Sequence, residues 1–198
     1  MRDPRAATAP DPRTATFAIR LAKPEEYAAA GDLVADVYRD EGFADGAYLA
    51  VLRDAARRAN EAELLVAAAP GGQIVGTITY AAGGTAFADI ALPDEAEFRM
   101  LAVAAAARGQ GVGERLVLAC IERARRQGRR RLVMSTQRDM RTAHRLYERL
   151  GFTRAPERDW SPQPGLNLRV YALELELAAS EREQTMPPAN PIANLGPR

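Results

Sequence analysis

The first half of the chain alternates between the hydrophobic period of a strand and that of a helix. Residues 17–21 alternate apolar and polar positions, which predicts a strand. Apolar residues then recur at helical spacing over residues 27–38 and 48–59, so we expect two helices there. Residues 64–69 and 74–80 are rich in β-forming side chains, and the Pro-Gly-Gly between them predicts a hairpin.

The second half of the chain contains further strand patterns at residues 97–103, 132–136 and 170–177. Residues 81–95 and 153–165 contain glycines or prolines without a clear period, so we expect connections there. In the strand at 97–103, strict alternation predicts two faces, with Glu97, Arg99, Leu101 and Val103 on one and Phe98, Met100 and Ala102 on the other.

Two more helices are predicted in this half. The first follows a glycine-rich loop, buries an apolar stripe that includes Cys120 and ends at Gln127 and Gly128. The second carries apolar residues from Met140 to Leu150, with Asp139 as its N-cap. Gly151 then supplies the left-handed C′ position, and Phe152 folds back as its hydrophobic contact.

The glycine-rich loop has the composition of an anion site. The start of a helix leaves its first N–H groups without internal partners and carries the positive end of the helix dipole. Glycines let a phosphate approach those N–H groups, and an arginine at the loop adds a charged donor. The cradle predicted on this basis consists of Arg108, Gly109, Gln110, Gly111, Val112, Gly113 and Glu114.

Two common phosphate loops are excluded by the details of this segment. A triphosphatase loop ends in Gly-Lys-Ser/Thr, which this chain lacks. A dinucleotide fingerprint needs G-x-G-x-x-G and an acidic residue about 20 residues later. Here the spacing is G-x-G-x-G, and the next strand ends in Ser135 and Thr136. The remaining pattern is Arg/Gln-x-x-Gly-x-Gly/Ala, which Arg108, Gly111 and Gly113 match.

With a Leu-Ala-Val strand before this loop and a later helix ending in Tyr-x-x-Leu-Gly-Phe, the chain resembles the GNAT superfamily of acyl-CoA-dependent N-acyltransferases. The resemblance implies an α/β (α+β) fold with one twisted, mixed, mostly antiparallel sheet of six to seven strands and about four flanking helices. Two central parallel strands are expected to splay apart. We expect this domain to span residues 16–178, between a flexible arm at 1–15 and a proline-rich tail at 179–198.

The resemblance also implies how acetyl-CoA is held as cosubstrate. The glycine loop binds the pyrophosphate, and exposed backbone groups of Leu101, Ala102 and Val103 bond the pantetheine arm. The family often carries Asn at the position of Met140, so the cofactor contact made there is in doubt, because a thioether cannot donate a hydrogen bond.

Two catalytic residues follow from the same resemblance. Tyr147 is the expected general acid near the coenzyme sulfur, although a core tyrosine on an apolar stripe is the alternative. Glu97 matches the glutamate that serves as a base in the histone-modifying branch, although an ion pair with Arg99 explains it equally well. His144, the one histidine, is expected at the surface or half-buried and not as a base.

The acceptor pocket is less well defined by the sequence. Trp160 lies in a loop of the kind that lines this pocket in the family, so it is the predicted substrate-binding residue. Tyr27, Tyr38 and Tyr48 are further candidates for the pocket wall, and nothing in the sequence separates them from core residues. The acceptor itself cannot be read from the sequence.

Composition narrows the remaining possibilities. Basic and acidic residues nearly cancel, at 27 and 26, so the net charge of +1 gives no argument for nucleic acid or a membrane. The arginine cluster at residues 123–131 favours a solvated helix end over binding to RNA or to the 3′-phosphate of the cofactor. A single cysteine, Cys120, fits a reducing cytoplasm, and a buried thiol is expected there instead of a nucleophile. We expect no metal.

These observations favour an enzyme that transfers acetyl from acetyl-CoA to a primary amine of a small molecule or peptide. Direct attack in a ternary complex is expected, because no covalent nucleophile is evident. A non-catalytic acyl-CoA sensor with the same cradle is the alternative, and nucleic-acid binding through the arginines is a third. A homodimer is left open.

Overall fold

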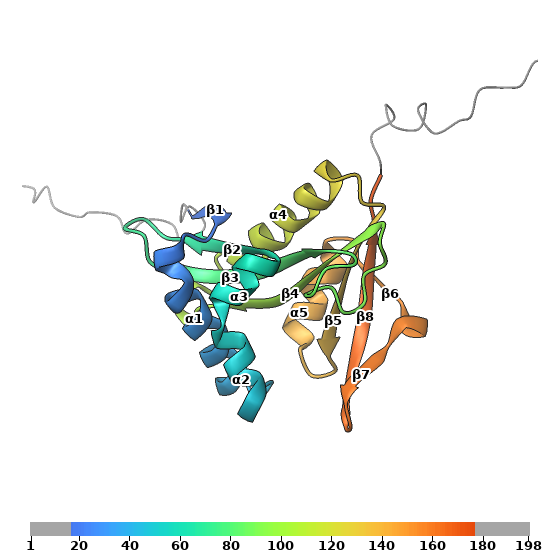
Figure 1. Cartoon of the computed structure of the whole chain (residues 1–198), viewed down its shortest axis with the longest axis horizontal. Helices are drawn as coiled ribbons and strands as arrows, with labels where there is room; N and C mark the ends of the chain where they lie inside the picture. Colours follow the sequence, from blue (N-terminus) through green and yellow to red (C-terminus); the bar gives the residue numbers. More distant parts are fainter. Residues whose placement is uncertain (1–16, 177–198) are drawn as a thin grey trace, which may run out of the picture.

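The computed structural model describes residues 17–176 and contains one eight-stranded sheet with helices on both faces (Figure 1). The strand order is β1-β2-β3-β4-β5-β8-β6, and β7 pairs with β8. The strands are β1 (Ala18–Leu21), β2 (Glu63–Ala68), β3 (Ile74–Ala82), β4 (Glu95–Val103), β5 (Arg131–Gln137), β6 (Thr153–Arg154), β7 (Trp160–Gln163) and β8 (Leu166–Glu174). All neighbours are antiparallel except β4 and β5, which confirms the predicted mixed sheet.

Within residues 17–176, five α-helices and three 3₁₀ turns connect the strands. The helices are α1 (Tyr27–Asp40), α2 (Gly46–Arg53), α3 (Ala55–Glu61), α4 (Val112–Arg126) and α5 (Arg141–Arg149), and the 3₁₀ turns are η2 (Pro24–Glu26), η3 (Ala105–Ala107) and η4 (Pro156–Arg158). Residues of α1, α2 and α3 cover one face of the sheet, and those of α4 and α5 pack in the core on the other.

The structure corrects several predicted boundaries. The helix expected at 48–59 is two helices, because Asp54 leaves helical geometry and its carboxylate accepts a hydrogen bond from the N–H of Arg57 at 3.0 Å. The connection expected at 153–165 contains the short strands β6 and β7, which the hydrophobic pattern does not mark and which bring the sheet to eight strands. Met140, not Asp139, is the N-cap of α5.

The helix ends near the predicted sites follow the sequence. Gly111 precedes α4 with φ of 79°, and Gly151 follows α5 with φ of 90°, which confirms the predicted left-handed C′ position. Phe152 is buried and its N–H donates to the carbonyl of Tyr147 at 3.0 Å. The predicted arm at 1–15 and tail at 179–198 lie outside the described residues.

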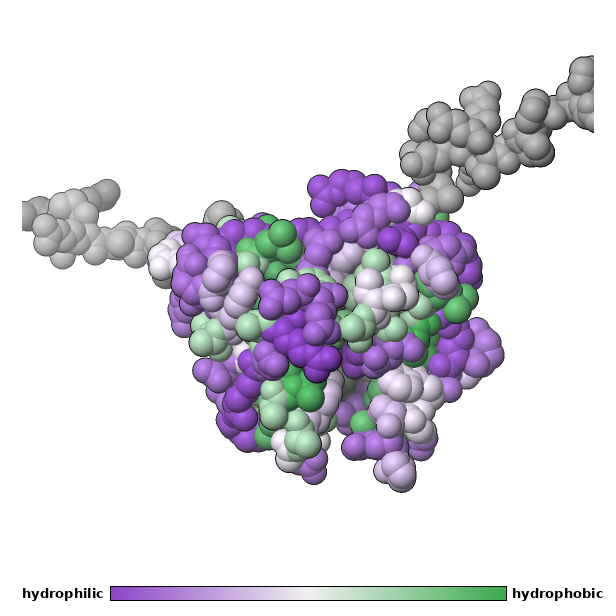
Figure 2. Space-filling model, viewed as in Figure 1, coloured by the Kyte–Doolittle hydropathy of each residue, from purple (hydrophilic) through white to green (hydrophobic). Residues whose placement is uncertain are grey.

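The start of α4 lies close against β3. A Cβ on Gly76 would sit 2.7 Å from Cγ1 of Val112, so glycine at this position lets the helix N-terminus approach the sheet. On the surface, a hollow lies between α2 and β7 at the lower edge of the view (Figure 2). The fold therefore places the glycine-rich helix start beyond the end of β4, the strand that borders the groove.

Candidate active site

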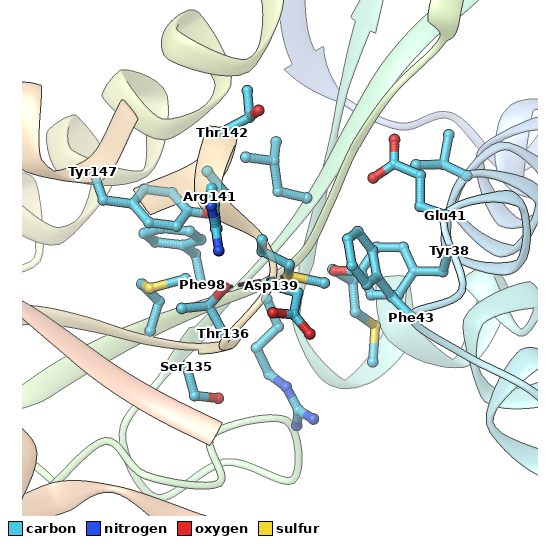
Figure 3. A pocket seen from close by; sticks show the side chains of 17 residues that line it. Tyr38, Glu41, Phe43, Phe98, Ser135, Thr136, Asp139, Arg141, Thr142 and Tyr147 are labelled. Atoms are coloured by element: carbon cyan, nitrogen blue, oxygen red, sulfur yellow. Dashed lines mark hydrogen bonds between the residues drawn. The ribbon is translucent and has the colours of Figure 1, made fainter. Parts of the chain in front are cut away.

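The two central strands separate after a short paired region. β4 and β5 pair only over residues 95–97 and 131–133. From Phe98 and Met134 onward they diverge, and a cavity of about 370 Å³ lies between them (Figure 3). This confirms the predicted split, and β4 beyond Glu97 has no strand partner on its cavity side among the described residues. Backbone groups of residues 101–103 on that side therefore have no strand partner and can bond an extended ligand, although the carbonyl oxygen of Val103 lies 3.4 Å from Nε of Arg108.

A bulge at Met100 changes which side chains face the cavity. Met100 has φ of 56°, and the pairing of β4 with β3 shifts there by one residue. As a result Phe98, Leu101 and Val103 pack on the α4 side, whereas Met100 and Ala102 pack against α1 and α2. The predicted alternation is wrong beyond this point, because a hydrophobic pattern does not reveal an extra residue in a strand.

The glycine loop forms an open cradle at the end of β4. Gly109 and Gly111 have φ of 74° and 79°, and a Cβ on either would meet no atom within 4 Å. The first helical hydrogen bond runs from the N–H of Arg115 to the carbonyl of Gly111 at 3.0 Å. The N–H groups of Val112 and Gly113 precede it and lie at the positive end of α4. These features fit a diphosphate, as the sequence pattern predicts.

Arg108 does not point freely into this cradle. Its Nη2 lies 2.5 Å from the carboxylate of Glu41, at the end of α1, and its Nε lies 3.4 Å from the carbonyl oxygen of Val103. Glu114 is likewise paired, with Arg149 at 2.6 Å. Both side chains lie at the predicted binding loop, but each is engaged by the protein in this structure.

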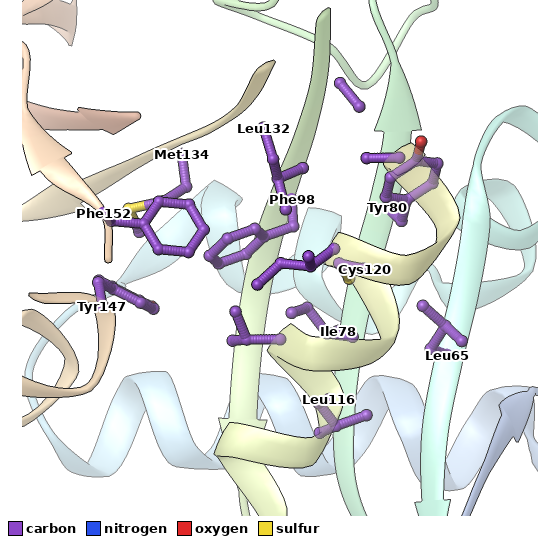
Figure 4. Packing of buried hydrophobic residues seen from close by; sticks show 14 of the residues in the cluster. Leu65, Ile78, Tyr80, Phe98, Leu116, Cys120, Leu132, Met134, Tyr147 and Phe152 are labelled. Carbon is purple, nitrogen blue, oxygen red and sulfur yellow. The ribbon is translucent and has the colours of Figure 1, made fainter. Parts of the chain in front are cut away.

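Tyr147 lies where the cavity meets the aromatic core. Its side chain is 3% exposed and lines the cavity, with ring centroids 5.6 Å from Phe98 and 6.0 Å from Phe152 (Figures 3 and 4). Burial raises the pKa of its phenol well above the ordinary value. The phenol therefore stays protonated near neutral pH and can act only as a proton donor there. The side chain of Tyr147 thus packs in the core, as the core alternative predicts, and also lines the cavity, as a general acid requires.

Glu97 does not line the cavity. Its carboxyl is fully buried and accepts hydrogen bonds from the N–H groups of Ile90 at 2.9 Å and Ala91 at 3.3 Å. Burial raises the pKa of Glu97 to about 7, and its second oxygen lies 3.8 Å from Nε of Arg99. The geometry supports the ion-pair alternative, and a catalytic role for Glu97 requires a bridging water.

A second cavity of about 640 Å³ continues from the first toward β7. Trp160 lines it together with Tyr38 and Tyr48, so three of the predicted pocket residues come together. Tyr27 does not, because it packs against the small cluster under α1 and α3. Both cavities are lined by Tyr38, Phe43, Arg99, Met100, Ser135, Thr136 and Met140, which makes them one continuous cleft.

Met140 lies in the cleft, as predicted for a cofactor-binding position, whereas His144 is more buried than predicted. Met140 lines both cavities, and the hydroxyl of Thr136 donates to its sulfur at 3.2 Å. His144 was predicted at the surface or half-buried, but only 8% of it is exposed, because it packs on Tyr171 with ring centroids 5.5 Å apart. Burial lowers its pKa, and its Nε2 lies 3.1 Å from the carbonyl oxygen of Gln137.

Cys120 is fully buried in the core beneath α4, and burial raises the pKa of its thiol. This confirms the expected buried thiol.

The arginine cluster is largely paired. Arg123 lies 2.7 Å from Glu63, and Arg130 and Arg131 both contact the buried carboxylate of Glu95. These ion pairs fit a structural role at a helix end better than an RNA-binding surface. None of the helices within residues 17–176 is long and apolar enough to cross a membrane.

Sequence reasoning missed two features of the cleft. Arg99 was considered only as a partner of Glu97, yet it lines both cavities. Phe43 and Glu41 come from the connection after α1, which has no hydrophobic period to mark it. The available signal was the glycine-flanked aromatic in Glu41-Gly42-Phe43, since binding residues often lie on such loops.

Solved structures share this fold. An acetyltransferase of the GNAT family from Staphylococcus aureus Mu50 matches with a TM-score of 0.67 at 17% identity, over 81% of this chain and 100% of that chain. The protein yncA of Salmonella typhimurium, solved with its cofactor acetyl-CoA, matches at 0.57 and 23%, over 83% and 96%. A ribosomal-protein-alanine N-acetyltransferase from Brucella melitensis matches at 0.58 and 22%, over 80% and 99%. At these identities the likeness establishes the fold.

Sequence comparison identifies the family directly. No curated protein matches the sequence. The model of the Acetyltransferase (GNAT) family matches residues 26–152, which is more than half of the chain and includes the split strands, the glycine loop and Tyr147. The chain therefore belongs to the GNAT family of acetyltransferases.

Proposed function

We propose that this protein transfers the acetyl group of acetyl-CoA to a primary amine of a small molecule or peptide. The observation that carries the proposal is the unpaired edge of β4 beyond Glu97. The phenol of Tyr147 lines the cavity beside this edge, and the glycine cradle at the start of α4 follows the same strand. A single buried thiol, Cys120, fits a reducing cytoplasm.

Each part of the cleft has a role in this proposal. The N–H groups at the start of α4 bind the diphosphate, and the free edge at Leu101, Ala102 and Val103 bonds the amides of the pantetheine arm. Bound acetyl-CoA supplies a thioester carbon that the neutral amine attacks directly, so that a C–N bond replaces the C–S bond. Tyr147 donates its proton to the leaving sulfur, and the proton lost by the amine leaves through water or Glu97.

Binding and turnover test the proposal separately. Isothermal titration is expected to show binding of CoA, and the absence of binding at millimolar CoA would remove the function altogether. Release of CoA is then measured with a panel of amines, amino acids and peptides. Tyr147→Phe removes one hydroxyl from the cleft and is expected to lower kcat by roughly 10²–10⁴-fold, the range for a lost general acid. Tyr27→Phe is the matched control, because Tyr27 lies outside both cavities.

A non-catalytic acyl-CoA sensor is a second candidate. The position of Glu97 favours it, because the predicted base lies buried behind the cavity instead of lining it. In a sensor, CoA binds but no acceptor increases its release, and Tyr147→Phe changes binding alone. A Tyr147→Phe variant that binds CoA normally but turns over slowly would exclude the sensor.

A further inference from the structure

Arg99 occupies the junction of the two cavities. It lies on β4 directly before the bulge at Met100, and it lines both the cavity beside Tyr147 and the cavity beside Trp160. Its side chain is 19% exposed. A charge in this position lies between the expected place of the thioester and the space for the acceptor, so it acts on any ligand that spans the two.

The guanidinium of Arg99 is only partly engaged by the protein. Its Nη1 lies 2.7 Å from the carboxylate of Asp89 and 3.4 Å from the carbonyl oxygen of Phe87, and its Nε lies 3.8 Å from Glu97. Among residues 17–176 its Nη2 donates no hydrogen bond, although the hydroxyl of Tyr48 lies close enough to the guanidinium for Arg99 to act on the pKa of Tyr48. Because a guanidinium presents its donors as a planar fork, one amino group remains available to a second anion.

Arg99 is the more buried of the two arginines that line the acceptor cavity, and the other, Arg39, is paired with Asp36 and Asp40. The acceptor cavity is formed mainly by aromatic and apolar side chains, among them Tyr38, Tyr48, Trp160 and Leu168. The acidic side chain that lines it, Asp45, is exposed at the N-terminus of α2. A half-buried cation in an apolar pocket attracts an anionic ligand group more strongly than the same cation in water does.

We propose that the acceptor is an amine that carries its own carboxylate, such as an amino acid with an apolar or aromatic side chain, and that Arg99 binds this carboxylate. The inference rests on the proposed acetyl transfer. A carboxylate held by Arg99 places the neighbouring amine at the junction of the cavities, where attack on the thioester must occur. Polycations such as spermidine are expected to be poor ligands, because the guanidinium of Arg99 repels further positive charge.

The test uses two acceptors that differ in one group. Phenylalanine and phenethylamine share the amine and the ring, but only phenylalanine has the carboxylate. With wild-type protein, kcat/KM is expected to be at least tenfold higher for phenylalanine. Arg99→Gln is expected to lower kcat/KM for phenylalanine by roughly 10–100-fold, the range for a hydrogen bond to a charged group, and to leave phenethylamine within about threefold. Leucine and 3-methylbutylamine form a second pair.

Asp89→Asn provides a variant with the opposite expected sign. Asp89 competes for the guanidinium, so its neutralisation is expected to lower KM for phenylalanine severalfold and to leave phenethylamine unchanged. This variant keeps the proposal testable if Arg99→Gln does not fold. Titration with CoA is run on every variant as the check of folding and of the cofactor cleft.

Several results would overturn the assignment. Equal use of phenylalanine and phenethylamine would do so, as would equal loss of both in Arg99→Gln, because that loss indicates a role in folding or in the chemical step. If neither compound is acetylated, the CoA-loaded protein is examined by thermal shift, and a shift with phenylalanine no larger than that with phenethylamine rejects the proposal. Failure to bind CoA rejects the acetyltransferase function itself and is therefore distinguishable.

Discussion

At the scale of single residues, burial sets the proton states around the cleft. Tyr147 and Glu97 are both buried, and burial raises the pKa of each. The consequences differ, because the ordinary pKa of a phenol already lies above neutrality whereas that of a carboxyl lies below it. Tyr147 therefore remains a donor, and Glu97 changes charge near pH 7.

The raised pKa of Glu97 predicts a pH-dependent loss of stability. The folded protein holds the proton up to a pH of about 7, whereas the unfolded chain loses it near the ordinary value of 4.5. The contribution of Glu97 to the free energy of unfolding is therefore fully present below pH 4.5. It falls as pH rises toward 7, by up to about 3 kcal/mol. Glu97→Gln is expected to remove this fall in urea denaturation at pH 5 and pH 8. An unchanged pH profile of kcat in the same variant would favour the structural role of Glu97 over the catalytic one.

The ion pair between Glu41 and Arg108 predicts a variant with tighter cofactor binding. Arg108 belongs to the predicted diphosphate loop, yet its guanidinium is held by Glu41 at 2.5 Å. Both side chains are partly exposed, so the pair is weak, on the order of 1 kcal/mol or less. Glu41→Gln is expected to lower the Kd for CoA by roughly two- to fivefold in isothermal titration. Glu122→Gln, which breaks an exposed pair with Arg125, is the control and leaves the Kd unchanged. Weaker binding in Glu41→Gln would show that Glu41 supports the loop.

At the scale of elements, the sequence predicted what depends on local pattern. The strand, glycine loop and helix around residues 97–126 were predictable because alternation, glycine spacing and helical period all occur within one short segment. The bulge at Met100 was not, since an extra residue in a strand leaves no mark in the hydrophobic pattern. The burial of His144 was missed for a similar reason, because its partner Tyr171 lies on a distant strand. Arg99 lies directly before this bulge and lines both cavities.

The contact between α4 and β3 predicts an effect of Gly76 on stability. A Cβ added there would lie 2.7 Å from Val112 and 3.0 Å from Leu116, so the helix must shift or its side chains must leave their preferred rotamers. Gly76→Ala is expected to reduce the free energy of unfolding by about 1–3 kcal/mol, as overpacking usually does. Gly113→Ala is the matched control, because its Cβ would meet ordinary contacts at 3.6 Å. Equal stability of the two variants in urea denaturation would show that α4 adjusts freely.

At the scale of the whole molecule, one buried carboxylate ties distant segments together. Glu95 at the start of β4 is fully buried and contacts Arg130 and Arg131 before and within β5 and Arg158 of η4. Burial alone raises the pKa of Glu95, but hydrogen bonds from Arg158 and from the N–H of Leu92 leave it below the ordinary value. The cluster lies where β4 and β5 are still paired, so it fixes the closed end of the split whose open end forms the cleft.

Because Arg158 joins this cluster and lies near Trp160, we expect its substitution to affect both the stability of the protein and the cleft. Arg158 lies two residues before Trp160. It donates hydrogen bonds to the carboxylate of Glu95 at 2.8 Å and to the carbonyl of Ile90 at 2.6 Å. Arg158→Met leaves a buried carboxylate with fewer partners and is expected to cost about 2–3 kcal/mol at pH 7 in urea denaturation. Because the lowered pKa of Glu95 stabilises the fold fully above the ordinary carboxyl pKa of 4.5, and this contribution is lost as pH falls through the lowered value, the difference from wild type is expected to shrink as pH falls toward 3. Arg125→Met, in an exposed pair, is the control at both pH values. Fluorescence of Trp160, the one tryptophan, reports whether β7 moves in the folded variant. If Arg158→Met destabilises the protein as much at pH 3 as at pH 7, the effect comes from lost packing of the side chain and not from the charge on Glu95.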